Sequence, residues 1–106
     1  MISQHGNAAL HEAAWNGYSR TLDALIRHKA NIHTANKYGD TPLHTAARYG
    51  HAGVTRILIS AHCRINEQNK NGDTGLHISA ALKRRKITKL LVDAGINVAS
   101  KNKVCF

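Results

Sequence analysis

The fold of this 106-residue chain is decided by the stretch GDTPLHTAARYGH, residues 39–51. Its first two residues are typical of a turn. The Thr41-Pro42 pair that follows is typical of a helix start, because threonine accepts a bond from an orphan backbone N–H and proline has the φ of the first helical position. The small and apolar side chains over 43–47 predict a short, close-packing helix, which Gly50 ends.

A second helix is predicted over 52–61, where Val54, Ile57 and Leu58 fall at helical spacing. The polar segment 62–70 that follows is typical of a loop. A unit of two short helices and a loop is too small to bury its own apolar face. Such a unit becomes stable only when it stacks on similar neighbours.

The same pattern recurs along the chain at a step of 33 residues. Several residue types fall in register, among them Gly6, Gly39 and Gly72; Leu10, Leu43 and Leu76; His11, His44 and His77; and Asn36, Asn69 and Asn102. The chain is therefore read as one domain of three tandem units, at about 5–37, 38–70 and 71–103. The stub 104–106 lacks the glycine that would open a fourth unit, which is typical of a fragment or a truncated form.

This unit resembles the ankyrin repeat, whose signature is a Thr-Pro-Leu-His-x-Ala stretch in 33 residues, found here at 41–46. The resemblance covers residues 5–103. It implies an all-α solenoid of three stacked helix-turn-helix units with projecting β-hairpin-like loops. A fainter similarity, carried by 6–12 and 72–77, is to the ankyrin domain of Diversin/Diego-type planar-polarity scaffold proteins.

The units depart from the ankyrin pattern at their helix ends. The glycine that closes the second helix is present at Gly95 but is replaced by Lys29 and His62 in the other two units. A non-glycine residue at positive φ costs about 1 kcal/mol, so we expect these two ends to be reshaped. Unit one has Ala8-Ala9 in place of Thr-Pro and lacks the cap. Unit three has Lys83-Arg84 where unit two has the helix-breaking Gly-His.

Composition bounds the function. Fifteen Lys and Arg against six Asp and Glu give a net charge of +9, which favours acidic partners, nucleic acid or an anionic membrane. Cys63 and Cys105 form neither a disulfide framework nor a CxxC pair, which indicates a reducing, cytoplasmic compartment. Apolar runs are far shorter than the ~20 residues of a membrane span, and no signal-peptide pattern opens the chain. No catalytic triad or phosphate-loop motif is found, so we expect no enzyme, no cofactor and no small-molecule substrate.

Eight histidines raise the question of a metal site. His11, His44 and His77 lie one stacked unit apart, and packed helices are ~8–10 Å apart, whereas metal ligands converge to ~2 Å from one ion. A shared metal site is therefore excluded. The ankyrin resemblance implies instead that each imidazole hydrogen-bonds backbone near a helix start and ties adjacent loops together.

A basic run, Lys83-Arg84-Arg85-Lys86 with Lys89 close behind, gives unit three much of the positive charge. We expect it at the exposed turn between the two helices. It fits nuclear import, binding of nucleic acid or an anionic membrane, or contact with an acidic partner. The alternative is a solvated positive face that keeps the terminal unit soluble. The aromatic interleaving of a single-strand stacking platform is missing.

The ankyrin resemblance places the partner-binding surface on the loop tips and the exposed face of the first helices, which together form a concave surface. These positions hold Asn7, Trp15, Asn16, Lys37, Tyr38, Asp40, Arg48, Tyr49, Lys70, Asn71, Asp73 and Leu82. We expect the three aromatics Trp15, Tyr38 and Tyr49 to anchor a protein partner, because Trp, Tyr and Arg dominate interface hot spots. The basic residues Arg48, Lys37 and Lys70 are expected to pair with its acidic groups. The alternative is incidental surface residues or contacts to a missing flanking unit.

These observations predict a protein–protein interaction module or scaffold of intracellular signalling. The alternative function is a basic module that binds nucleic acid or an anionic membrane through residues 83–89, with nuclear entry through the basic run.

Overall fold

The computed structural model describes residues 4–95. Within this range the chain forms α1 (Gln4–Asn16), α2 (Ser19–Arg27), α3 (Pro42–Tyr49), α4 (Ala52–Ser60), α5 (Gly75–Ala81) and α6 (Arg85–Asp93). The predicted stub, Asn102 and Cys105 lie outside the described residues, as does the side chain of Asn7.

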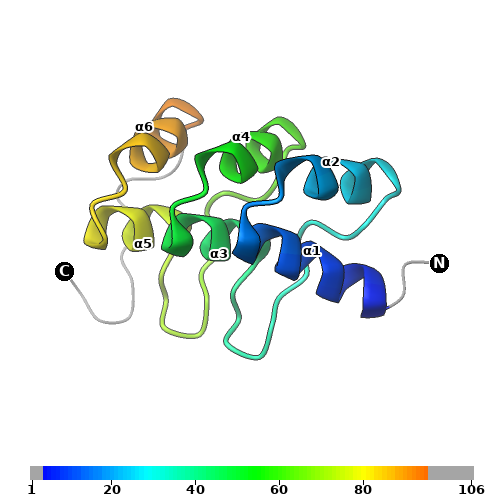
Figure 1. The fold of residues 1–106 in the computed structure, drawn as a ribbon. Helices are drawn as coiled ribbons and strands as arrows, with labels where there is room; N and C mark the ends of the chain where they lie inside the picture. Colours follow the sequence, from blue (N-terminus) through cyan, green and yellow to red (C-terminus); the bar gives the residue numbers. More distant parts are fainter. Residues whose placement is uncertain (1–3, 96–106) are drawn as a thin grey trace.

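The helices alternate between two layers (Figure 1). α1, α3 and α5 stack side by side in one layer, and α2, α4 and α6 stack in the other. The body measures 39 × 25 × 21 Å. The predicted all-α solenoid is confirmed, and both predicted unit boundaries fall in loops. No helix among the described residues is long and apolar enough to cross a membrane.

The core lies between the layers and between the units. It is built from small side chains of the inner helices and branched side chains of the outer ones: Leu10, Ala13, Ala14, Leu22, Leu43, Ala46, Ala47, Val54, Leu58, Ile78, Ile87 and Leu91. Alanine on the inner helices lets their backbones approach closely, and leucine and isoleucine from the outer helices fill the remaining space. Unit two has neighbours on both sides, and every residue from Thr41 to Ala47 is buried.

The first helix of unit one begins earlier than its counterparts. α3 begins at Pro42 and α5 at Gly75, each directly after a threonine N-cap. α1 instead runs from Gln4 through the Ala8-Ala9 pair that replaces Thr-Pro. Alanine neither caps a helix nor removes a backbone donor, so nothing in the sequence stops the helix at this point.

The helix ends that lack glycine keep the left-handed conformation. Lys29 has φ 66°, His62 has φ 62° and Lys83 has φ 60°, close to the φ of 77° at Gly50. The expectation that the ends at Lys29 and His62 are reshaped is therefore wrong. Each end closes with the two bonds of a Schellman motif, from Lys29 to Ile26 and Ala30 to Leu25 in unit one and from His62 to Ile59 and Cys63 to Leu58 in unit two. These bonds hold the left-handed residue at a local cost of about 1 kcal/mol.

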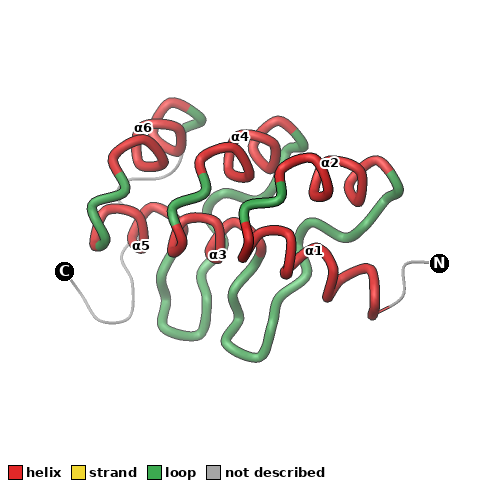
Figure 2. Tube along the Cα trace, in the orientation of Figure 1, coloured by secondary structure: helices red, strands yellow, loops and turns green. Residues whose placement is uncertain are grey.

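The projecting loops contain no strand within residues 4–95 (Figure 2). They are organised by asparagine. Asn36 Oδ1 accepts bonds from the N–H groups of Tyr38 at 2.9 Å and Asp40 at 3.1 Å. Asn69 Oδ1 does the same for Asn71 and Asp73. Backbone bonds from the Asn36 N–H to the Asp40 carbonyl and from the Asn69 N–H to the Asp73 carbonyl close the same two loops, so each asparagine holds its loop through both its side chain and its backbone.

Candidate protein-binding surface

The inner helices of units one and two each end in an aromatic side chain, and the two rings meet. Trp15 and Tyr49 are stacked with centroids 4.7 Å apart and an interplanar angle of 27°. The α1 end is held in place by His51, whose Nε2 lies 2.8 Å from the Trp15 carbonyl oxygen. Trp15 nevertheless remains 57% exposed. The sequence predicted both aromatics as surface residues, and the structure brings them into contact.

A groove of about 420 Å³ runs beside this aromatic pair. It is lined by His11, Glu12, Trp15, Asn16, Asn36 and Thr45. One wall is therefore the last two turns of α1, and the opposite wall comes from α3 and the loop before it. The groove offers an indole face, two amides and a carboxylate to a ligand.

Two of the predicted surface residues, Asp40 and Arg48, pair with each other inside unit two. Asp40 is only 4% exposed, so its placement on the binding surface is wrong. Its Oδ2 accepts a bond from Arg48 Nη1 at 2.8 Å, and its Oδ1 accepts one from Asn69 Nδ2 at 2.9 Å. Burial alone would raise the pKa of the Asp40 carboxyl, but these bonds outweigh it and hold the pKa below its ordinary value. The Arg48 guanidinium therefore bonds within unit two.

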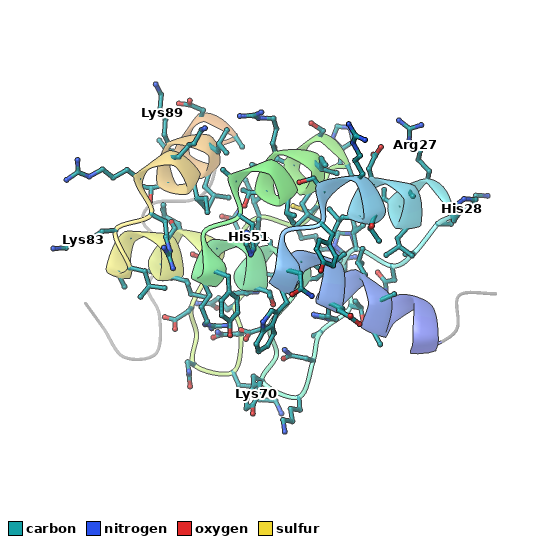
Figure 3. The ribbon with its side chains drawn as sticks, viewed as in Figure 1. Arg27, His28, His51, Lys70, Lys83 and Lys89 are labelled. Atoms are coloured by element: carbon teal, nitrogen blue, oxygen red, sulfur yellow. The ribbon has the colours of Figure 1, made fainter. Side chains whose placement is uncertain are left out.

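The third predicted aromatic lies apart from the stacked pair. Tyr38 is 60% exposed on the loop tip, and Lys37 Nζ lies 5.2 Å from the centre of its ring. The Tyr38 carbonyl accepts a bond from the Lys70 N–H at 3.1 Å, which links the tips of two successive loops. Lys70 projects from the end of its loop (Figure 3). The loop tips therefore form a second, basic part of the predicted surface.

The remaining predicted surface residues are dispersed. Asn16 is exposed and donates to the Glu12 carbonyl at 3.0 Å, and Asn71 is exposed at a loop tip. Leu82 is exposed just after α5, at the position that Tyr49 holds in unit two. Asp73 is half-buried, and its backbone carbonyl belongs to the loop contact described next.

Two members of the histidine column, His11 and His44, make the loop contacts that the ankyrin resemblance implies, and His77 makes the contact at its own helix start. His44 Nδ1 accepts from the Thr41 N–H at 3.0 Å, so the neutral ring carries its proton on Nε2, which donates to the Asp73 carbonyl at 2.7 Å. His11 Nε2 reaches the Thr34 carbonyl at 3.1 Å. His77 Nδ1 accepts from the Thr74 N–H at 2.9 Å. Burial lowers the pKa of both His11 and His44, which favours the neutral imidazoles.

Metal ligands, the cysteine thiol and the basic run were the other candidate groups. No group of three His, Cys, Asp or Glu side chains there is arranged to hold a metal ion. Burial raises the pKa of the Cys63 thiol to about 11, so the thiol stays protonated and unreactive. The basic residues Lys83, Arg84, Arg85, Lys86 and Lys89 are all exposed at the α5–α6 turn and the start of α6.

Sequence reasoning missed Asn36 and Asn69 as site residues. Asn36 lines the groove and shapes the loop that carries Tyr38. The signal was present, because Asn36 and Asn69 stand in register one unit apart, but register alone does not say that the amide closes the loop. Glu12 and Thr45 were also missed, since neither has a sequence neighbour that marks it as groove-lining.

A two-layer stack of helix pairs, in which each pair contacts its neighbours, defines the chain as a solenoid repeat protein. The model of the family described as ankyrin repeats matches residues 4–102 in three copies. The chain therefore belongs to the ankyrin-repeat family, whose members in general bind other proteins. Among curated proteins, no sequence matches the chain, and the fainter similarity to Diversin/Diego-type scaffolds stays a prediction.

Proposed function

We propose that this chain is a non-enzymatic scaffold of intracellular signalling that binds a protein partner on the groove and the stacked pair Trp15–Tyr49. The observation that carries the proposal is the exposure of this pair. Trp15 is 57% exposed and is fixed by stacking on Tyr49. The two rings lie on two rigid helices, next to a groove of about 420 Å³. Aromatic side chains held in this way bury much area at low entropic cost.

The charge of the surface supports a more specific expectation about the partner. Lys37 and Lys70 are exposed on linked loop tips, which suits acidic groups on the partner. Arg48 is not part of this expectation, because its guanidinium is paired with the Asp40 carboxylate. The partner is therefore expected to place an apolar or aromatic side chain in the groove and acidic groups at the loop tips.

The test is affinity capture from a nuclease-treated extract at near-physiological salt, with wild type, Trp15→Ala/Tyr49→Ala and Tyr18→Ala as baits. Tyr18 is the matched control, because it is 55% exposed but lies at the α1–α2 turn. Proteins held by wild type and Tyr18→Ala should be lost by the double variant. Truncation of a hot spot costs at least about 2 kcal/mol, or roughly 30-fold in Kd. Equal capture by all three baits would assign the partner to another surface.

A further inference from the structure

The turn between α5 and α6 concentrates positive charge, most of which makes no contact within the described part of the fold. Lys83, Arg84, Arg85 and Lys86 are exposed in succession, and Lys89 follows one turn later. Lys83 and Lys89 point away from the body (Figure 3). Within residues 8–95, none of these five side chains makes an ion pair with an acidic group. Arg84 alone is anchored, by a bond from Nη2 to the Arg48 carbonyl at 2.9 Å.

The equivalent turns of the other units show that this charge is not needed for the fold. Residues 17–20 read Gly-Tyr-Ser-Arg and residues 50–53 read Gly-His-Ala-Gly, and both make the same turn. Unit three instead places Lys83 at φ 60°, where the other units have glycine. It also places Arg85 and Lys86 in the first turn of α6, where cations oppose the helix dipole. Both features lower local stability, so we infer that these cations serve binding and not folding.

The cations also shape a small groove. It has a volume of about 150 Å³ and is lined by Gly50, Ala52, Arg84, Arg85, Lys86 and Ile87. The bond to the Arg48 carbonyl fixes Arg84 across Gly50, so one wall of the groove is preformed. At roughly 30 Å³ for each water molecule, the groove has the volume of about five waters. This volume suits a phosphate group between the three cations Arg84, Arg85 and Lys86.

An exposed apolar side chain adjoins the cluster. Leu82 is 47% exposed and directly precedes Lys83. Clustered cations beside an insertable apolar side chain are typical of proteins that bind the surface of anionic membranes. Residues 80–93 contain no aromatic side chain on which a nucleic-acid base would stack. The cluster is also short, since its five cations lie within residues 83–89, whereas a polynucleotide presents phosphates along its whole length.

We propose that the α5–α6 turn binds an anionic lipid bilayer, with a lipid phosphate in the groove at Arg84–Lys86 and Leu82 at the acyl boundary. This site is separate from the surface around Trp15 and Tyr49. The two surfaces would let one chain hold a protein partner at a membrane.

The first test is co-sedimentation of the full chain with vesicles at about 0.15 M salt, where charges beyond about 8 Å are screened. The vesicles are neutral phosphatidylcholine, phosphatidylcholine with phosphatidylserine, and phosphatidylcholine with a phosphoinositide at matched total charge. We expect binding to both anionic vesicles, stronger with the phosphoinositide, and none to the neutral ones. Equal binding to neutral and anionic vesicles would overturn the proposal.

The variant Lys83→Gln/Arg85→Gln/Lys86→Gln should bind anionic vesicles on the order of 100-fold more weakly, because each cation near such a surface contributes about a factor of five. The matched control Arg20→Gln/Lys29→Gln/Arg56→Gln removes the same charge from exposed positions elsewhere. It should retain binding within a few-fold. An equal loss in the control would show that net charge alone is at work and would overturn the site.

Two further arms separate the site from misfolding and from nucleic acid. Lys83→Gly removes a cation and also relieves the positive φ, so it should bind vesicles several-fold more weakly while the protein becomes more stable. Unchanged vesicle binding by this variant would contradict the proposal. Oligonucleotides are offered to the same proteins. Tighter binding of these than of vesicles, lost in the same triple variant, would assign the cluster to nucleic acid instead.

Discussion

Units one and two carry the same histidine at the same step of the repeat, but only one of the two rings has both nitrogens satisfied. His44 is 1% exposed, accepts at Nδ1 and donates at Nε2. His11 bonds at Nε2, while its buried Nδ1 has no partner. The donor that serves His44 is the Thr41 N–H. Its counterpart in unit one, the Ala8 N–H, lies inside α1 and is used by the helix itself.

The difference shows that the Nδ1 atom of the histidine finds a hydrogen-bond donor only where the helix has an N-cap residue. Because α3 begins at Pro42, the Thr41 N–H that precedes it makes no bond within the helix and is available to the imidazole of His44. A helix that continues toward the N-terminus withdraws that N–H and orphans the ring nitrogen. Two alanines in place of Thr-Pro are therefore enough to change a buried hydrogen bond three residues away.

The largest expected effect comes from removing each ring in turn. His44→Ala should lower the free energy of unfolding by about 3 kcal/mol, because the buried Thr41 N–H loses its acceptor and the Asp73 carbonyl keeps only its bond from the Asn69 N–H. His11→Ala should cost only about 1 kcal/mol, since one bond is lost and an orphan nitrogen is removed with it. Urea unfolding of the two variants measures the difference. Equal costs would show that the Thr41 bond carries no stability.

Restoring the missing cap should repair unit one. In Ala8→Thr/Ala9→Pro, proline disfavours helix before residue 9, so the residue-8 N–H is released for His11 Nδ1. We expect stability to rise by about 1 kcal/mol while helix content falls by about one turn. Circular dichroism and thermal unfolding report the two changes. Ala8→Thr alone is the control, because α1 stays continuous and neither change is expected.

A smaller effect tests the turn of unit three against that of unit two. Lys83→Gly should raise stability by somewhat less than 1 kcal/mol, since glycine adopts positive φ without a Cβ penalty. Gly50→Ala should lower stability by a similar amount, because φ is 77° and the new Cβ would lie 3.1 Å from Arg84 Nη1. Melting temperatures that move in the same direction for both variants would refute this account of the strain.

The two buried rings also make the stability depend on pH. Burial lowers the pKa of His44 and His11 below the ordinary 6.5, so on acidification the unfolded chain takes up protons before the folded chain does. Stability should therefore fall as the pH drops through 6.5 and level off below the folded pKa values, with a slope of at most about 1.4 kcal/mol per pH unit for each ring.

The variant His44→Gln isolates one ring. Glutamine at this position preserves the capping box with Thr41 but does not titrate. Its unfolding free energy, measured by urea titration from neutral to mildly acidic pH, should show a shallower slope than wild type. The double variant His11→Gln/His44→Gln should be shallower still. A slope that stays at the wild-type value would contradict the burial of these rings as its cause.

The stacking of units could be predicted because it depends on residues that repeat. Leu43, His44 and the alanines at 46–47 recur every 33 residues, so one unit predicts the others. The start of α1 could not be predicted, because the sequence showed that a cap was absent and not where the longer helix would begin. The left-handed φ at Lys29 could not be predicted from the cost of positive φ alone, because two backbone bonds at the end of α2 offset that cost.

The candidate surface was predicted only in part. Exposure of Trp15 and Tyr38 follows from their positions in the repeat, and the structure agrees with it. The burial of Asp40 depends on Arg48 and on Asn69 of the next loop, and no sequence pattern showed that the three meet. The stacking of Trp15 on Tyr49 likewise depends on the crossing of two helices, which spacing within one helix does not determine.

The Trp15–Tyr49 contact bridges the junction between units one and two, and its position has a consequence for how the protein frays. The principal helix contacts link only neighbouring units, so opening propagates along a line of coupled segments. A partner seated on this pair would clamp the first junction and leave the second untouched. Amide exchange in α1 and α2 would then slow on binding, while α5 and α6 would continue to open at their own rate. With the partner bound, this protein would therefore unfold locally from unit three only.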